Sequence, residues 1–357
     1  MPDKKKILLI GFDSNLCLGI VYCLKKYGYS FYVLSWNKNI STKYSFFVKK
    51  TFIYENYDHL EQTVIDIVQK HKIDLIMPFD ENEIRWVKEK NEVLSKYAAC
   101  TWGTQPDLFE LGINKRRLAE FLTEHDIPCP RFATVYNKEQ LKEESEKIGY
   151  PLLIKPTRSN FGRGIQKFEN WDELKAFYTE DKDPEKEYII QPFLIGSDVT
   201  CNVICREGEI LCHTIQESPV KTGSNFSSND ILEFHEDEGV IAAIAPMLKL
   251  LKWHGVACID MRRDQRDGQV KILEINGRFW ASMVSSYLKA GVNFPLIQVK
   301  LALGEKVDFP KMHPAFQIAF KQYLINLRSF KKTSFKDTKY ISYISDPIAR
   351  ALQMMGL

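Results

Sequence analysis

The 357-residue sequence contains no apolar run of the roughly 18 residues that a membrane-spanning helix needs. The apolar run after the first residues, MPDKKK, is shorter than the roughly 7–15 residues of a signal peptide. No CxxC pair, internal repeat or low-complexity segment occurs. The eight cysteines lie mostly in apolar or strand-like runs, so we expect reduced core thiols rather than disulfides or a metal site. These absences lead us to expect a cytoplasmic protein.

A strong excess of charge of one sign is also absent, because 49 Lys and Arg face 46 Asp and Glu. A net charge of +3 does not favour nucleic acid, which requires concentrated basic surface. The charge is uneven, however, since residues 311–357 hold eight basic and two acidic side chains. Aromatic residues are interleaved with these lysines, a pattern that suits RNA, an anionic membrane or a partner. A solvated face on a C-terminal helix and loop is the favoured interpretation.

The first hundred residues alternate between strand-like and helical patterns. Ile7–Ile10 is followed by a glycine-containing turn and a helical pattern that ends at Gly28, and SFYVLS resembles a second strand. This alternation predicts a parallel sheet with helices on both faces. The loop from Gly11 to Gly19 lacks the GxGxxG pattern of a dinucleotide site, so we expect a tight turn there.

The pattern changes beyond residue 105. DLFELGINKRRLAEFLTEH, after Pro106, is predicted to form one helix that ends before DIPCP, where two prolines prevent continuation. From Tyr188 onward short runs alternate with period two, which predicts antiparallel strands.

The first candidate site lies in GYPLLIKPTRSNFGRGI, where Lys155 interrupts an apolar, strand-like run. A buried ammonium without a partner is costly, so Lys155 is predicted to meet an anion. The loop after Lys155 supplies backbone amides, polar side chains and a guanidinium for a polyphosphate. Its candidate residues are Ser159, Asn160, Gly162, Arg163 and Gly164. A surface hairpin in which Lys155 pairs with a neighbouring carboxylate is the competing interpretation.

The second candidate site lies in ACIDMRRDQRDGQVKILEINGRFW, where the Asp267-Gly268 turn joins two alternating runs. Glu274 and Asn276 are two residues apart and share one face of a strand. A strict two-residue loop would place Asp260 on the opposite face, so we predict a bulge or a longer loop. Two carboxylates and a carboxamide then form an oxygen site suited to Mg²⁺. The competing interpretation is a solvated acidic sheet face.

Together these motifs resemble the ATP-grasp superfamily of ligases over roughly residues 111–304, with a preceding α/β domain. The resemblance implies two phosphate lysines, Lys115 and Lys155, and Mg²⁺ ligands at Asp260, Glu274 and Asn276. It implies an adenine-binding hinge in YIIQPFLIGSD, with a ribose-binding acid after it, at Gln191, Pro192, Leu194 and Asp198. The E-x-N-x-R pattern implies a catalytic role for Arg278, and Lys221 is a weaker catalytic candidate near the γ-phosphate.

Several positions depart from the superfamily pattern. The hinge holds Gln191 where many members have Glu, and the shorter Asp198 occupies the ribose position. Cys258 stands where some relatives place an arginine for the developing oxyanion. Arg278 must therefore carry more of that role.

The resemblance implies a parallel-sheet α/β domain at residues 1–105, followed by a two-lobed α+β ATP-grasp domain with antiparallel sheets. The linker helix and first lobe with the phosphate lid would span 106–195, and the second lobe with the metal site 196–310. A basic tail would span 311–357. The implied cofactors are ATP and Mg²⁺, with Mn²⁺ as an alternative ion. The implied partners are small molecules, not nucleic acid or membrane, and a homodimer is left open.

The implied activity is an ADP-forming carboxylate–amine ligase that makes an acyl phosphate from an amino-acid-like acid. One alternative is phosphorylation of bicarbonate or carbamate, as in carbamoyl-phosphate synthases. Another is a non-catalytic ATP-binding regulatory module, which the intact Asp260, Glu274 and Asn276 set argues against. The acids of PFDENE, Pro78 to Glu83, follow a predicted parallel strand, where ligands usually enter. One interpretation is that they hold an amine; the other, at least equally favoured, is that Asp80 caps the next helix.

Overall fold

The computed structural model describes residues 4–158, 164–177, 187–219, 231–329, 331–338 and 345–355. Its first sheet is parallel, with strand order β3-β2-β1-β4-β5. The strands are β1 (Lys6–Ile10), β2 (Ser30–Ser35), β3 (Val48–Ile53), β4 (Leu75–Pro78) and β5 (Ala99–Cys100). The helical segments among them are α1 (Ser14–Leu24), η1 (Ser41–Tyr44), α2 (Leu60–His71), α3 (Glu81–Glu89) and α4 (Asn91–Leu94).

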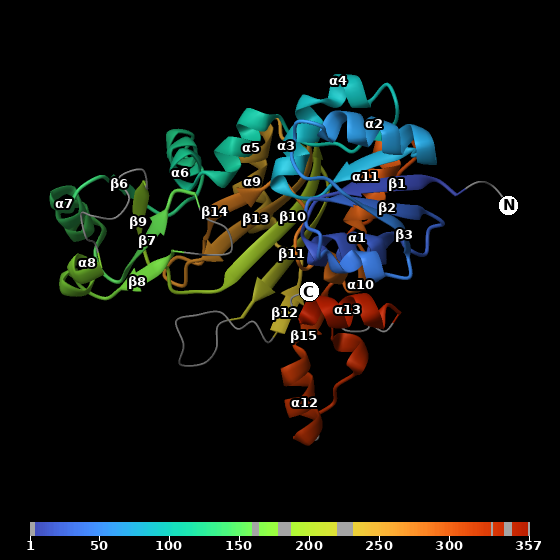
Figure 1. Cartoon of the computed structure of the whole chain (residues 1–357). Coiled ribbons are helices and arrows are strands. Elements are labelled where there is room, and N and C mark those ends of the chain that lie inside the picture. Colours follow the sequence, from blue (N-terminus) through green and yellow to red (C-terminus); the bar gives the residue numbers. More distant parts are fainter. Residues whose placement is uncertain are drawn as a thin grey trace.

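The alternation of side chains along β1 explains the layers around this sheet. Ile7 and Leu9 pack into the core that contains α1, whereas Leu8 and Ile10 pack into the core that contains α2. Helices therefore cover both faces, as the sequence predicts, and Figure 1 shows α1 and α2 on opposite sides of the sheet.

A smaller antiparallel sheet with order β6-β9-β7-β8 forms a separate layer at the left of Figure 1. Its strands are β6 (Ala133–Val135), β7 (Leu152–Pro156), β8 (Gln166–Phe168) and β9 (Tyr188–Pro192). Helices α7 (Lys138–Ile148) and α8 (Trp171–Phe177) pack on it and enclose Leu141, Ile154 and Leu174. This sheet carries Lys155.

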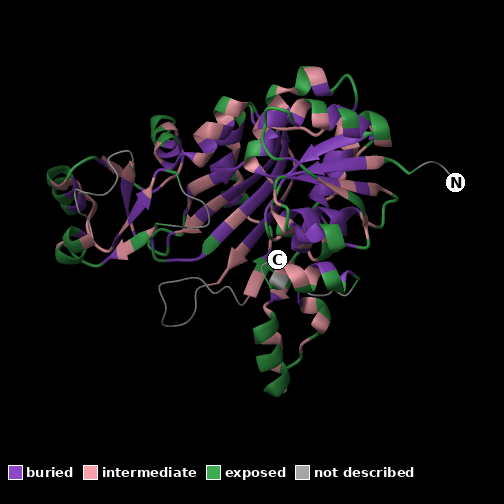
Figure 2. Cartoon of the chain, in the orientation of Figure 1, coloured by how far each residue is buried: buried purple, intermediate pink, exposed green. Residues whose placement is uncertain are grey.

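The third sheet has the order β14-β13-β10-β11-β12-β15 and is antiparallel throughout. Its strands are β10 (Asp198–Arg206), β11 (Glu209–Ser218), β12 (Ile231–Phe234), β13 (Gly255–Arg263), β14 (Val270–Asn276) and β15 (Ala315–Ile318). Helices α9 (Glu238–Leu250), α10 (Met283–Leu288) and α11 (Phe294–Ala302) follow or interrupt these strands. Figure 2 shows that β10 and β13 lie in the buried centre of the molecule.

The prediction of a single helix after Pro106 is wrong. The structure has α5 (Pro106–Ile113) and α6 (Lys115–Glu124), separated by Asn114 with φ −93° and ψ 105°. The Asn114 side chain accepts a hydrogen bond from the Arg117 backbone N–H and so caps α6. The Lys115 backbone N–H then donates to the Thr157 carbonyl instead of continuing α5. The break thus places Lys115 beside the end of β7.

The basic segment 311–357 contains β15, α12 (Phe320–Arg328), η2 (Phe335–Asp337) and α13 (Pro347–Met354). Helix α12 has no buried residue and extends away from the body at the bottom of Figure 1, as expected of a solvated helix. In contrast, β15 pairs with β12, and α13 packs against η1. The solvated-tail interpretation therefore holds for α12 but not for β15 and α13.

The eight cysteines are free thiols, as the sequence predicts. Among the helices of the described ranges, none is both long and apolar enough to span a membrane. The domain limits given above remain a prediction.

Candidate active site

The predicted carboxylate pair forms on neighbouring strands. Asp260 on β13 lies directly opposite Glu274 on β14, while the next pair towards the turn is Met261 with Ile272. Leu273 is therefore the extra residue of a bulge, and the loop from Asp264 to Gln269 is longer than two residues. The predicted bulge and the longer loop are both present, and together they bring Asp260 onto the face of Glu274.

Thr200 on β10 extends this row, because it pairs with Asp260 from the other side. The Thr200 hydroxyl donates to Asp260 Oδ1 at 3.0 Å, and Asn276 Nδ2 donates to Oδ2 at 3.4 Å. Burial, followed by the negative charge of Glu274, raises the pKa of Asp260 to about 6. A cation between the two carboxylates would relieve that repulsion.

These oxygens fit Mg²⁺, which protein sites bind through one or two carboxylates together with water and substrate phosphate. Across the described ranges no cluster of three or more His, Cys, Asp or Glu side chains is placed to hold a metal ion. The donor set of Asp260, Glu274 and Asn276 thus has the composition of a phosphate-assisted magnesium site rather than an all-protein cage.

Two lysines from different layers lie beside this row. Lys155 ends the buried part of β7 and is only 7% exposed, and Lys115 at the start of α6 is 6% exposed. Lys115 Nζ lies 3.6 Å from Glu274 Oε2. Burial, then the positive charge of Lys115, lowers the pKa of Lys155 to about 8. The nearby carboxylate of Glu274 acts on Lys155 in the opposite direction and favours its charged form, and the role of Lys155 as an anion site stays a prediction.

The predicted phosphate loop is described at its two ends, and Gly164 is the candidate among the described residues. Gly164 has φ 78°, and a Cβ there would lie 2.8 Å from Cγ of Pro156, so glycine is required where the loop returns to β7. The other loop candidates and the catalytic candidate Lys221 lie outside the described residues; the loop candidates are Ser159, Asn160, Gly162 and Arg163.

The hinge candidates connect the small sheet to the large one. Gln191 and Pro192 end β9, where they pair with Leu153 and Leu152. Leu194 is buried, and its carbonyl accepts from Arg262 Nε at 2.6 Å. Asp198 begins β10 and forms an ion pair with Arg262. Arg262 therefore ties the predicted adenine segment to the predicted ribose acid.

Arg278 leaves the end of β14 and reaches the parallel-sheet unit. Its Nε lies 3.1 Å from Glu81 Oε1, and its NH1 group donates to the Phe279 carbonyl at 3.0 Å. A cavity of about 170 Å³ separates Arg278 from Phe12, Asp13 and Asp80. This cleft lies at the carboxyl ends of β1 and β4, where ligands enter parallel sheets.

The capping role considered for Asp80 is wrong. Its side chain makes no cap hydrogen bond to α3 and instead accepts from the backbone N–H groups of Phe12 and Asp13. Burial raises the pKa of Asp80 to about 7 although these hydrogen bonds favour the charged form. Asp80 thus holds the turn after β1, at the position where we predicted a tight turn without a nucleotide fingerprint.

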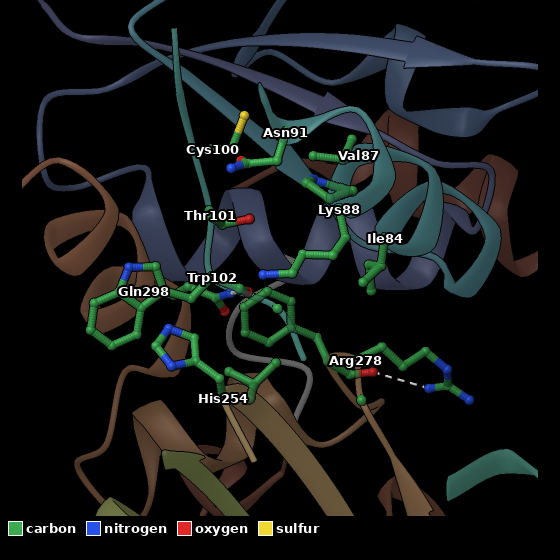
Figure 3. Close-up of a pocket in the computed structure, with 15 residues that line it drawn as sticks. Ile84, Val87, Lys88, Asn91, Cys100, Thr101, Trp102, His254, Arg278 and Gln298 are labelled. Atoms are coloured by element: carbon green, nitrogen blue, oxygen red, sulfur yellow. Dashed lines mark hydrogen bonds between the residues drawn. The ribbon is translucent and has the colours of Figure 1, made fainter. Parts of the chain in front are cut away.

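Another cavity of about 170 Å³ lies behind the backbone of residues 277–279. Figure 3 shows Lys88 extending toward Trp102 and Gln298, whereas the Arg278 guanidinium points away from them. The guanidinium of Arg278 is therefore directed away from this cavity.

Three residues that sequence reasoning missed complete the site: Thr200, Glu81 and Arg262. Period-two spacing placed Arg262 on the face of Asp260 and could have identified it. Glu81 lies in MPFDENE, whose acids were assigned to an amine, but its partner is Arg278. No sequence pattern identified Thr200 as a site residue, because its neighbours across the sheet depend on the pairing of β10 with β13.

Comparison with known proteins agrees with this geometry. Residues 113–282 match a family model described as an ATP-grasp domain. The carbamoyl phosphate synthase large chain of Archaeoglobus fulgidus is 25% identical over 327 residues, covering 85% of this chain and 30% of the relative. The chain thus spans under a third of the length of such curated relatives.

Solved structures share the fold at low identity. N5-carboxyaminoimidazole synthetase from Staphylococcus aureus, complexed with ADP, has a TM-score of 0.67 and 16% identity over 91% of this chain and 86% of its own. L-amino acid ligase from Bacillus licheniformis has a TM-score of 0.63 and 17% identity over 85% of this chain and 75% of its own. These similarities confirm the predicted fold class.

Proposed function

We propose that this chain, whose residues 113–282 match a model of the ATP-grasp domain, is an ATP-dependent, ADP-forming carboxylate–amine ligase for a small, amino-acid-like acid. The observation that supports this most is the convergence of Asp260 and Glu274 with the buried Lys115 and Lys155. Two acids and two lysines around one space are suited to a metal-bound polyphosphate. Arg278 lies just beyond β14, where an acid substrate can meet the nucleotide.

In the first proposed step, a carboxylate oxygen of the acid forms a bond to the γ-phosphorus of ATP, and the bond to the ADP oxygen breaks. In the second step, the amine nitrogen attacks the acyl carbon, phosphate leaves with its bonding electrons, and the amine loses a proton. The protein contributes position and charge. Lys115 and Lys155 hold phosphate oxygens, and Arg278 orients the acid and stabilises the developing oxyanion.

Asp260, Glu274 and Asn276 are the residues that would hold magnesium. The ion supplies charge neutralisation between phosphate oxygens. Thr200 and Asn276 fix the orientation of the Asp260 carboxylate through their hydrogen bonds. Use of Mn²⁺ and the cytoplasmic location stay predictions.

The hinge is proposed to receive the adenine. Leu194 and Pro192 would offer backbone N–H and carbonyl groups, respectively, which is compatible with the missing N–H of proline. Arg262 pairs with Asp198, so the Asp198 carboxylate must share this arginine or release it when a ribose hydroxyl binds. The segments that would close over the phosphates lie outside the described residues.

A second candidate reaction is phosphorylation of bicarbonate or carbamate. The similarity to carbamoyl phosphate synthase large chains favours it, but the chain covers only 30% of the relative's length. The two reactions differ in one requirement, since only the second depends on bicarbonate. ATP turnover in bicarbonate-depleted buffer separates them.

The test of the leading proposal is ATP turnover with Mg²⁺, hydroxylamine and a panel of carboxylic acids that includes the amino acids. Hydroxylamine converts an acyl phosphate to a hydroxamate without the natural amine. We expect ADP and hydroxamate in equal amounts with one group of acids, and loss of both in Glu274→Ala. Formation of AMP would contradict the acyl-phosphate mechanism. Absence of hydroxamate with every acid, despite nucleotide binding, would favour the regulatory-module alternative.

A further inference from the structure

The C-terminal helix α13 returns to the N-terminal unit and is anchored there by a buried carboxylate. Asp346, at the N-cap position of α13, has no exposed surface. It accepts from the hydroxyl groups of Tyr22 and Ser45 and from the Phe46 backbone N–H. Three donors from α1 and the η1 region thus fix the start of the helix.

The residues of α13 that follow add an apolar contact and side-chain hydrogen bonds to α1. Ala349 is fully buried and packs with Leu18 and Tyr22 of α1. Gln353 donates to Asn15 Oδ1, and the Arg350 NH1 group donates to Asn15 and to Gln353. Helix α13, the last helix of the described ranges, is therefore held against α1.

This docking brings a second guanidinium into the cleft of Arg278. Arg350 and Arg278 both line a cavity of about 230 Å³, together with Asp13, Asn15 and Leu16. Asp13, Leu16 and Arg278 also line the neighbouring cavity of about 170 Å³ below α3. The two cavities are adjacent parts of one cleft, with Arg278 and Asp13 at their junction.

The charges differ between the two parts. On the α13 side, two arginines face one carboxylate, that of Asp13. This carboxylate caps α1, because its Oδ1 accepts hydrogen bonds from the backbone N–H groups of Asn15 and Leu16. On the α3 side, three carboxylates face one arginine. Arg278 borders both parts and pairs with Glu81, so Arg350 supplies the additional positive charge of the α13 side, which favours an anionic group there.

We propose that the acid substrate carries a second anionic group, which Arg350 binds while Arg278 binds the carboxylate that is activated. This inference rests on the proposed ligase function and specifies its substrate class. The second group can be a carboxylate or a phosphate, because a guanidinium recognises both through paired N–H donors. The C-terminal segment would then contribute a specificity-determining residue to a site otherwise built from the N-terminal unit and β14.

The test uses the full chain in the hydroxamate assay with acids that differ by one charge. The pairs are aspartate and asparagine, glutamate and glutamine, and phosphoserine and serine. We expect one acidic member to exceed its neutral partner by at least about tenfold in kcat/KM, which corresponds to about 1.4 kcal/mol. The aspartate and glutamate pairs test a carboxylate as the second group, and the phosphoserine pair tests a phosphate.

Variants separate recognition of the substrate from anchoring of α13. Arg350→Gln should raise KM for the acidic member about tenfold, leave its kcat and the KM for ATP unchanged, and abolish the preference within the pair. Arg350→Lys should retain part of the preference because the positive charge remains. Ser45→Ala removes one of the hydrogen bonds that anchor Asp346 at the start of α13 without contacting Arg350, and should leave the preference unchanged.

Equal effects of Arg350→Gln on both members of a pair, or the same loss of preference in Ser45→Ala, would overturn the inference by showing that Arg350 only secures the helix. Hydroxamate formed solely from neutral members would overturn the inference while the ligase proposal stands. Absence of hydroxamate with any acid would overturn the ligase proposal and this inference together.

Discussion

At the scale of single residues, Lys155 links burial to ligand charge. Its position within β7 places an ammonium in a desolvated site beside Lys115, and its pKa is lowered to about 8. A bound phosphate would stabilise the ammonium and raise this pKa again. Nucleotide binding above pH 8 therefore requires uptake of a proton, which makes the affinity depend on pH.

The first prediction is that ADP affinity falls as the pH rises through about 8, by less than tenfold per pH unit. Below that pH the free protein already carries the charge, so the affinity should be nearly constant. Calorimetric dissociation constants at about pH 7 and about pH 9.5 measure the change. Lys155→Arg is the matched control, because its guanidinium stays protonated and should flatten the profile. An unchanged slope in this variant would assign the titration to another group.

At the scale of elements, the break between α5 and α6 positions Lys115. The helical periodicity continues across residues 107–124, yet Asn114 adopts an extended conformation and caps α6. The Thr157 carbonyl replaces the carbonyl that an unbroken helix would offer to the Lys115 N–H. A local cap and one tertiary hydrogen bond thus override the periodic pattern.

The second prediction concerns this cap. Asn114→Ala should destabilise the protein by about 1 kcal/mol, because the Arg117 N–H loses its acceptor near a buried helix start. It should also weaken ADP binding, because Lys115 is the first residue of α6. Thermal denaturation and calorimetry measure the two effects. Asn114→Asp keeps an acceptor oxygen and should retain most of the stability; equal losses in both variants would contradict a capping role.

At the scale of the whole molecule, the ion pair of Glu81 and Arg278 joins the parallel-sheet unit to the end of β14. The two residues are 197 positions apart in the chain. In the proposed ligase, Glu81 would orient the guanidinium but would also compete with the substrate carboxylate for it. Removal of its charge should therefore affect binding and turnover in opposite directions.

The third prediction is that Glu81→Gln lowers KM for the acid substrate several-fold and lowers kcat by about tenfold. The acid gains a less engaged arginine in the ground state, while the transition state loses an oriented one. Steady-state kinetics of ADP release at saturating ATP measure both constants. Glu83→Gln is a control on the same helix, since Glu83 contacts Tyr54 and Tyr57 rather than Arg278. A rise in KM in Glu81→Gln would show that Glu81 supports acid binding instead.

The amino-acid sequence by itself determined the features that depend on local pattern. Neighbouring residues along the chain set which face a strand residue occupies and how far it is buried. For this reason the sequence predicted the apolar alternation of β1, the turn at Asp267-Gly268 and the unusual lysine in β7. The alternation of side chains also predicted a bulge or a longer loop, since a strict two-residue loop would place Asp260 off the face of Glu274. The structure has both, with Leu273 as the bulged residue.

Only the tertiary structure decided which distant groups meet. Four features join segments that are far apart in the chain: the Thr200–Asp260 contact, the Arg262–Asp198 pair, the Glu81–Arg278 pair and the return of Arg350 to the cleft. Strand order and helix docking set these neighbours, and both arise from burial across whole sheets rather than from residues in sequence. The residues of the candidate site could therefore be selected from the sequence, whereas the charges around the cleft beside Arg278 could not.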